Sequence, residues 1–190
     1  IRQQDDETDH SAESSLSTSD TFSLKLLDRA VAIAKTTSPL IRPIKVGSQS
    51  YYVCFLHPFQ VKDMRQSTNT GDWLDIQKAA MTGGEVAENP IFTGALGVYN
   101  GVVLHEWTRL PAITTGVGAE TGRRAVFCGA QAAAMAWGKG FSDNPKYIEE
   151  QFDYDRQMGV SVQTIMGAKK LQYNSKDFGT IVISTYAAAP

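Results

Sequence analysis

The stretch that decides the fold covers residues 24–56 and reads LKLLDRAVAIAKTTSPLIRPIKVGSQSYYVCFL. Its first part places apolar residues three or four positions apart, which predicts a helix over residues 24–35, with Asp20 or Thr21 as its N-cap. The Ser38-Pro39 pair ends that helix because the residue before a proline avoids helical geometry. The second part holds two β-rich runs, residues 41–46 and 51–56, and the polar linker between them predicts a hairpin. The stretch therefore indicates a domain of mixed α and β structure.

The rest of the chain continues this mixture. Helices are predicted over residues 59–65, over residues 73–81 and, from a run rich in alanine, over residues 130–137. Asn100-Gly101 is a tight-turn signal. Strands are predicted over residues 102–110, 125–128, 147–154, 158–173 and 178–186, and residues 111–122 form a long loop of small residues. Val160 and Val162 alternate with polar residues, as they would on a half-buried strand.

Composition excludes several classes of protein. The 190 residues are 42% hydrophobic and 20% charged, which excludes collagen, coiled coil and wholesale disorder. Residues 1–20 carry six acids against Arg2, a net charge of −5, so the remainder carries +3. That excess is too small to indicate nucleic-acid binding. Residues 1–21 are polar and acidic, and we expect a flexible arm or a piece of an extended loop.

Targeting and membrane signals are not expected. No basic region followed by an apolar stretch precedes residue 20, so no secretory signal is visible. The longest nearly apolar run, residues 125–137, is too short to cross a bilayer. Cys54 and Cys128 lie in separate apolar runs, which is typical of packed free thiols and not of a disulfide framework.

Two groups of residues carry the enzyme-like hypothesis. His105-Glu106 resembles the start of a zinc-protease helix, but position 109 is Arg where that motif needs a second histidine. Asp153 and Asp155, with Glu149 and Glu150 nearby, could supply a carboxylate pair for acid-base or magnesium chemistry. On a predicted strand, however, an acidic face toward solvent or a neighbouring subunit is the more common arrangement.

The remaining candidates are weaker. Gly116 to Gly122 does not match a dinucleotide fingerprint, because its third glycine falls one position late. Cys128 has apolar flanks, which favour an inert thiol. The pairs Arg123-Arg124 and Lys169-Lys170 could meet phosphates, although solvated or inter-subunit ion pairs are commoner. The sequence therefore predicts no catalytic, cofactor-binding or metal-ligating residues and no cofactor.

Several longer strings, taken together in order, resemble the major capsid proteins of tailed bacteriophages. They are Leu27–Lys35, Ile41–Ile44, Tyr51–Pro58, Asn89–Gly97, Asn100–Glu106, Arg124–Ala132, Phe152–Asp155, Gly167–Lys170 and Asp177–Gly179. The resemblance covers residues 22–186. It implies the α+β fold of the tailed-phage coat proteins, in which a peripheral domain contains a spine helix and long strands, and an axial domain surrounds each capsomer axis.

On this chain, the resemblance implies a peripheral domain over residues 22–40 and 147–186, an axial domain over residues 41–146 and a tail at residues 187–190. Residues 111–122 would be a capsomer-centre loop. An arm and an extended β loop, if they exist, would lie before residue 1.

The expected function is therefore a major capsid protein, not an enzyme, that self-assembles into hexamers and pentamers of an icosahedral head around double-stranded DNA. Its expected partners are other copies, a portal, a scaffold or decoration proteins, and packaged DNA contacted non-specifically, with no membrane. It would be made in the host cytoplasm and reside in the virion. Two alternatives stay open: a small soluble hydrolase using His105, Glu106, Asp153 and Asp155, and an accessory decoration or head-completion protein.

Overall fold

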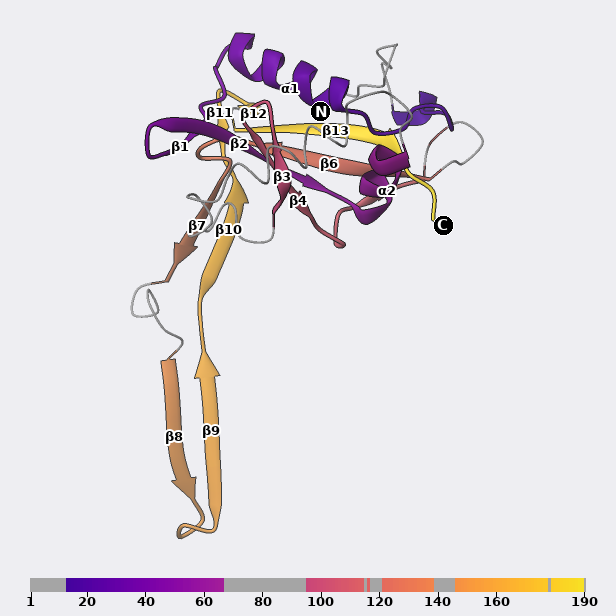
Figure 1. The fold of residues 1–190 in the computed structure, drawn as a ribbon. Coiled ribbons are helices and arrows are strands. Elements are labelled where there is room, and N and C mark those ends of the chain that lie inside the picture. The colour runs from indigo at the N-terminus through magenta and orange to yellow at the C-terminus, as the bar shows by residue number, and fades with distance from the viewer. Residues whose placement is uncertain are drawn as a thin grey trace. The chain divides into compact units, whose positions relative to one another are not determined.

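The computed structural model describes residues 13–66, 95–114, 116, 121–138, 146–177 and 179–189. They belong to two compact units, a body that comprises the chain up to Ala132 and from Gln172 onward, and a hairpin unit, Ala133–Leu171 (Figure 1). Residues 1–12 of the expected arm and the predicted helix over residues 73–81 lie outside the described residues. These two units have boundaries different from those of the peripheral and axial domains that the resemblance implies.

The body is built on a seven-stranded sheet. Its main path has the order β13-β6-β2-β4-β3, with β1 added to β2 and β5 added to β6. The strands are β1 (Ile44–Val46), β2 (Gln49–Leu56), β3 (Ala95–Tyr99), β4 (Val102–Glu106), β5 (Ala112–Ile113), β6 (Gly122–Cys128) and β13 (Thr180–Tyr186). The pair β2–β4 is parallel, whereas the other pairs of this sheet are antiparallel.

Two α-helices pack on this sheet. In Figure 1, α1 (Leu24–Thr36) lies alongside β13, and α2 (Pro58–Gln66) follows β2 directly. The apolar stripe of α1 is buried, with Leu26, Leu27 and Ala30 at 1% exposure or less. The core that it covers contains Leu56 from β2 and Phe127 from β6, whose ring centroid lies 4.9 Å from that of Tyr52. The predicted helix over residues 24–35 and the predicted hairpin of β1 and β2 are thereby confirmed.

Side-chain hydrogen bonds link the short 3-10 helix η1 (Glu13–Ser15) and α2 to the strands of the sheet. The helix η1 is held through Glu13, which bonds to Arg124 and Ser184, while Leu16 beside it is buried. On α2, the buried Gln60 accepts a hydrogen bond from the His57 N–H and donates to the Arg123 carbonyl and the Thr185 hydroxyl. A small hairpin of β11 (Gln172–Tyr173) and β12 (Lys176–Asp177) precedes β13.

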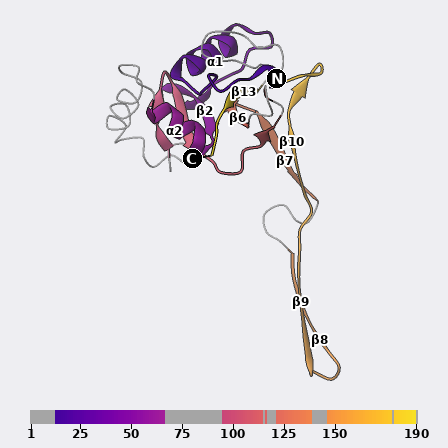
Figure 2. The same cartoon turned by 90° about the vertical axis from the view of Figure 1, so that its right-hand side faces the viewer.

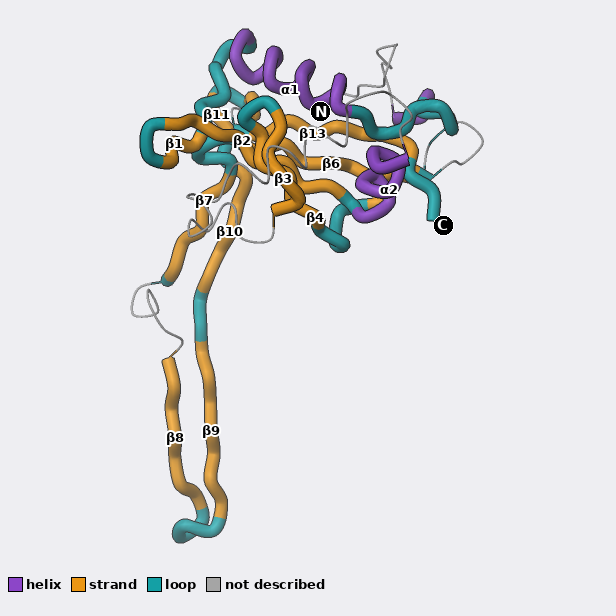
Figure 3. The backbone as a smooth tube through the Cα atoms, viewed as in Figure 1, coloured by secondary structure: helices purple, strands orange, loops and turns teal. Residues whose placement is uncertain are grey.

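The hairpin unit consists of paired antiparallel strands. β7 (Ala133–Trp137) pairs with β10 (Met166–Lys170), and β8 (Lys146–Phe152) pairs with β9 (Gln157–Gln163). Figures 2 and 3 show β8 and β9 running side by side as a ribbon of two strands. Among the described residues of this unit, none belongs to a helix or to a third strand that would cover the ribbon.

Several local predictions are wrong. Residues 130–137 do not form a helix: Gln131 is in a turn with a φ of 61°, and Ala133–Trp137 is a strand. Helix propensity is a weak preference, and the hydrogen bonds supplied by β10 outweigh it. The helix α1 begins after Ser23, so neither Asp20 nor Thr21 is its N-cap. The Asp20 carboxylate instead accepts hydrogen bonds from the Ser17 N–H and hydroxyl. The strand predicted over residues 102–110 ends at Glu106.

Candidate assembly surfaces

The residues of the hydrolase hypothesis lie in different units and environments. His105 and Glu106 end β4 in the body, where the His105 ring lies 5.7 Å from Phe55 and Glu106 is exposed. Asp153 and Asp155 lie in the turn of the hairpin unit, not on a strand as predicted. Within the described parts of the chain, no three His, Cys, Asp or Glu residues gather in a way that could hold a metal ion.

The two thiols are poor nucleophiles. Burial raises the pKa of Cys54 far above its ordinary value and raises that of Cys128 to about 11. Both sulfurs are free and protonated at neutral pH, so they lack the thiolate that nucleophilic catalysis requires. Of the glycine-rich stretch, residues 117–120 lie outside the described residues.

Arg123 and Arg124 both contact other side chains of the body. Arg124 forms a salt bridge with Glu13, whose oxygens lie 2.8 Å from its Nε and 2.5 Å from its Nη2. The guanidinium carbon of Arg123 lies 5.6 Å from the centre of the Phe59 ring, within the range of a cation–π contact. Sequence reasoning missed Glu13 as the partner because the two residues are 111 positions apart. Lys169 and Lys170, by contrast, lie exposed on β10.

The most unusual feature is the apolar surface of the hairpin unit. Among the described residues of this unit, ten large hydrophobic side chains are at least 45% exposed. They are Met135, Trp137, Tyr147, Phe152, Tyr154, Met158, Val160, Val162, Ile165 and Met166. Exposed apolar groups on this scale mark interaction surfaces. The alternation of Val160 and Val162 predicted the strand, but both side chains are exposed, not half-buried.

The strand register sorts these side chains by face. Opposite residues of an antiparallel pair point to the same face, and neighbours along a strand alternate. Met158, Val160 and Val162 of β9 therefore share one face with Tyr147 of β8. The other face contains Phe152, whose ring lies over Gly159: a Cβ placed there would come within 2.5 Å of it. Glu149 and Gln151 of β8 lie on the same face as Tyr147, opposite Val160 and Met158. We call the four apolar residues of this face, Met158, Val160, Val162 and Tyr147, the apolar stripe.

The paired strands β7 and β10 also have two different faces, one with large apolar side chains and one with small residues. Trp137 lies opposite Met166, and Met135, two residues away, shares their face. The reverse face presents Ala134 and Ala136 together with Gly167, beside which a Cβ would meet no atom within 4 Å. The small residues allow another backbone to come close to the reverse face, which also carries Lys169 opposite Ala134.

Charge is also distributed unevenly along the hairpin unit. Residues 149–156, around the turn, carry Glu149, Glu150, Asp153 and Asp155 against Arg156, a net charge of −3. The other described residues of the unit carry Lys146, Lys169 and Lys170, a net charge of +3. The unit thus has an acidic tip, which we define as residues 149–156.

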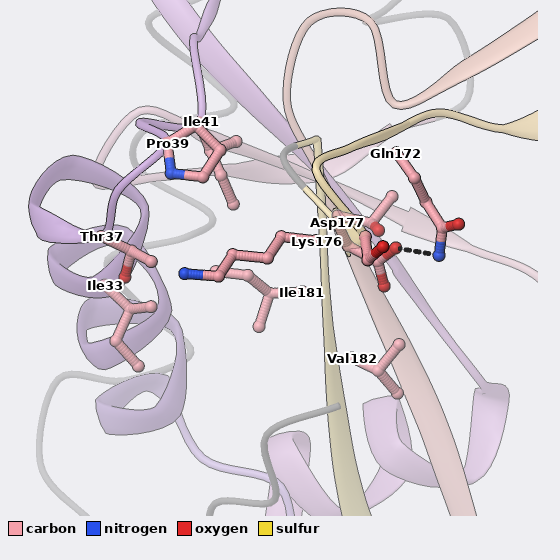
Figure 4. A pocket seen from close by; sticks show the side chains of 11 residues that line it. Ile33, Thr37, Pro39, Ile41, Gln172, Lys176, Asp177, Ile181 and Val182 are labelled. Atoms are coloured by element: carbon pink, nitrogen blue, oxygen red, sulfur yellow. Dashed lines mark hydrogen bonds between the residues drawn. The ribbon is translucent and has the colours of Figure 1, made fainter.

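The body contains a half-open cavity of about 330 Å³ between the C-terminal part of α1 and the strands β11, β12 and β13 (Figure 4). Its walls include the apolar side chains of Ile33, Pro39, Ile41, Ile181 and Val182. Lys176 and Asp177 also line it. None of the residues that line the cavity belongs to the catalytic, metal-ligating or phosphate-binding candidates of the sequence.

Comparison with known proteins shows the family of this chain. Residues 3–189 match the family described as phage capsid protein. A major capsid protein of Pseudomonas phage KPP25 is 33% identical over 198 aligned residues, which cover 95% of this chain and 49% of that protein. The chain belongs to the phage capsid protein family, which confirms the resemblance seen in the sequence. This family consists of structural proteins and not of enzymes, so the hydrolase alternative is not supported.

Solved capsids have the same fold. The capsid of Ralstonia phage GP4 gives a TM-score of 0.81 at 31% identity, covering 94% of this chain and 51% of that chain. The capsid asymmetric unit of cyanophage Pam1 gives 0.72 at 23% identity, covering 93% and 50%. These likenesses confirm the expected α+β capsid fold. The chain spans about half the length of the relatives that it matches.

Proposed function

We propose that this protein is a major capsid protein whose copies assemble into hexamers and pentamers of an icosahedral phage head that encloses double-stranded DNA. The apolar surface of the hairpin unit supports this proposal most directly. An isolated two-stranded hairpin is marginally stable in water, and the described residues of the hairpin unit include ten exposed large hydrophobic side chains. A neighbouring copy that covers the apolar stripe would remove this surface from water and stabilise the ribbon at the same time.

The proposal extends to partners and location. The protein would be synthesised in the bacterial host and would reside in the virion shell. There it would contact a portal, a scaffold or decoration proteins and, through scattered cations, packaged double-stranded DNA. The described residues form two α-helices, α1 and α2. Neither helix is long and apolar enough to cross a membrane.

Domain roles are proposed on the resemblance alone. Residues 22–40 and 147–186 would belong to the peripheral domain, residues 41–146 to the axial domain, and residues 111–122 to a loop at the capsomer centre. Because β13 pairs with β6 over the whole strand, the two proposed domains would share one sheet.

Val162→Lys tests the role of the apolar stripe. Val162 is 65% exposed and lies opposite Tyr147 in the stripe. A lysine that must be desolvated at a contact should cost about 2 kcal/mol or more per contact, which is roughly 30-fold in affinity. We expect the variant not to assemble, as judged by electron microscopy and analytical ultracentrifugation of the protein expressed with any sequence that flanks this chain.

Ser161→Lys is the matched control, because Ser161 is the preceding residue of β9 and points to the opposite face. We expect closed shells, tubes or capsomer rings from the wild type and from this control. A wild-type protein that remains monomeric would refute the proposed function. Normal assembly of Val162→Lys would show instead that the stripe is not part of an interface.

A further inference from the structure

The charged residues of the hairpin unit are separated toward its two ends. The acidic tip carries a net charge of −3, and the lysines farther from the turn, Lys146, Lys169 and Lys170, carry +3. Residues 139–145, outside the described residues, add one Lys and one Asp to the sequence and leave this balance unchanged. Figures 1 and 2 show the turn and β10 at opposite ends of the unit. The unit thus has opposite charges at its two ends and no net charge as a whole.

The two ends are too far apart to neutralise each other within one copy. The seven residues of β9 alone span roughly 20 Å at about 3.4 Å per residue, and β10 follows beyond them. At physiological ionic strength, charges more than about 8 Å apart are largely screened from each other. Another molecule must therefore bring cations to the acids of the turn.

The apolar surface restricts which molecule that is. Ten of the thirteen exposed large hydrophobic side chains among the described residues belong to the hairpin unit. The other three, Leu40, Trp107 and Tyr173, lie in separate segments of the body. Because an apolar surface leaves water most completely against another apolar surface, the best match that the described chain offers to one hairpin unit is a second hairpin unit.

The charges on the apolar faces match in the same way. On the face of the apolar stripe, Glu149 is the charged residue, and it lies opposite Val160. On the face that Trp137 and Met166 share, Lys170 is the charged residue. Desolvating either charge at a contact is costly unless an opposite charge pairs with it. Each apolar face therefore carries the partner that the other requires.

We infer that the hairpin units of two copies pack antiparallel, with their apolar faces toward each other and the acidic tip of each beside the lysines of the other. The inference rests on the proposed function, because it names the part of the neighbouring copy that covers the apolar stripe. A parallel arrangement would place two acidic tips side by side, where like charges repel. The antiparallel contact is isologous, since a two-fold rotation joins the same surface of both copies.

Charge reversal at each end of the unit tests this arrangement. The tip variant combines Glu149→Lys with Glu150→Lys, which changes the charge of the acidic tip from −3 to +1. The lysine-end variant combines Lys169→Glu with Lys170→Glu, which changes the opposite end from +3 to −1. Either variant brings like charges together, so we expect it to associate at least tenfold more weakly than the wild type. Analytical ultracentrifugation of the protein with any sequence that flanks this chain measures the association.

The variant with all four substitutions has opposite charges at its two ends again, with their signs exchanged. We expect its association to return to within about threefold of the wild type. Mixed with differently tagged wild-type chains, however, it should co-purify with them at least tenfold less than with its own kind, because antiparallel packing would bring the two positive ends together. A parallel arrangement predicts the reverse, so strong co-purification would overturn the inference.

Lys35→Glu with Lys45→Glu is the matched control. It makes the same change in net charge as the lysine-end variant, at two exposed lysines of the body, and should associate like the wild type. If the four-substitution variant stays as weak as either variant alone, the inference is refuted, whether another contact or a misfolded hairpin is the cause.

Electron microscopy of the same samples separates this inference from the proposed function. Shells of equal yield from every variant would refute the antiparallel contact and leave the proposed function standing. Association that follows the exchanged charges but never leads to shells would support the contact and contradict the proposed function. A wild-type chain that remains monomeric would refute both.

Discussion

The ion pair between Glu13 and Arg124 predicts that the N-terminal part of the body is attached in a pH-dependent way. One Glu13 oxygen accepts hydrogen bonds from Arg124 Nε at 2.8 Å and Ser184 Oγ at 2.9 Å, and the other accepts from Arg124 Nη2 at 2.5 Å. The Arg124 hydrogen bonds hold the Glu13 pKa below its ordinary 4.5, although partial burial acts in the opposite direction. The perturbation to make is Glu13→Gln, which preserves size and removes the charge.

Hydrogen bonds to charged groups contribute about 1.5–3 kcal/mol each to stability. The two side chains are 17% and 33% exposed, so solvent screening reduces the total. We therefore expect Glu13→Gln to lower the free energy of unfolding by about 2 kcal/mol at pH 7, which is well above the screened value of a surface pair, about 0.2–1 kcal/mol.

The sign of the pH dependence follows from the direction of the pKa shift. A carboxyl whose pKa is lower in the folded state stabilises that state fully above its unfolded pKa, here about 4.5. That contribution is lost as the pH falls through the folded value. The difference between wild type and Glu13→Gln should therefore be constant from about pH 6 to 8 and shrink below about pH 4.5.

Urea unfolding at pH 7 and at about pH 3.5 measures this difference, and hydrogen exchange of residues 13–22 shows whether the loss is local. Glu150→Gln, which removes an exposed carboxylate of the hairpin unit, is the matched control and should change nothing. Equal stability of wild type and Glu13→Gln at pH 7 would refute the reasoning. So would a difference of the same size at both pH values.

Two further predictions concern the body. Gln60→Leu leaves the His57 N–H, the Arg123 carbonyl and the Thr185 hydroxyl without their shared partner. We therefore expect the free energy of unfolding, measured by urea titration, to fall by about 3 kcal/mol. Unchanged stability would show that these groups find other partners. Gly129→Ala would place a Cβ 2.6 Å from the Arg42 carbonyl oxygen and 2.5 Å from Ile41 Cγ2, so we expect a loss of about 1–3 kcal/mol in thermal unfolding. Gly167→Ala, whose Cβ would meet nothing within 4 Å, should stay within about 0.5 kcal/mol of wild type, and an equal loss in both variants would contradict the argument.

The parts of the fold that could be predicted from the sequence depend on local signals. The apolar spacing of α1 lies within 13 residues, and the turn at Asn100-Gly101, with φ values of 45° and 73°, joins adjacent strands. The strand β7 could not be predicted, because its hydrogen-bond partner begins at Met166 and its own composition favours a helix. The parallel pairing of β2 with β4 and the Glu13–Arg124 pair depend in the same way on residues distant in sequence.

The sequence predicted some residues of the candidate surfaces but not their exposure. Alternation at Val160 and Val162 indicates a strand with one apolar face, but an apolar face has the same pattern whether its own chain or another copy covers it. Likewise, Asp153 and Asp155 look like a carboxylate pair only if the strand continues through them. The turn that isolates Tyr154 has positive φ angles at residues 153–155, a conformation that a tyrosine rarely adopts.

The place where the hairpin unit joins the chain has a consequence for how this protein can vary. The body is left after Ala132 and re-entered at Gln172, between β6 and β13, which are neighbours in the sheet. The two ends of this insertion are held close together, since the Gly129 N–H donates to the Gly179 carbonyl at 2.9 Å and Gly179 packs against Ala132. Residues 133–171 are thus an insertion between two neighbouring strands. We expect that this insertion can be lengthened, shortened or exchanged without a change in the strand order of the sheet. If copies associate through the hairpin unit, as proposed above, their contacts can change while the sheet of the body stays the same.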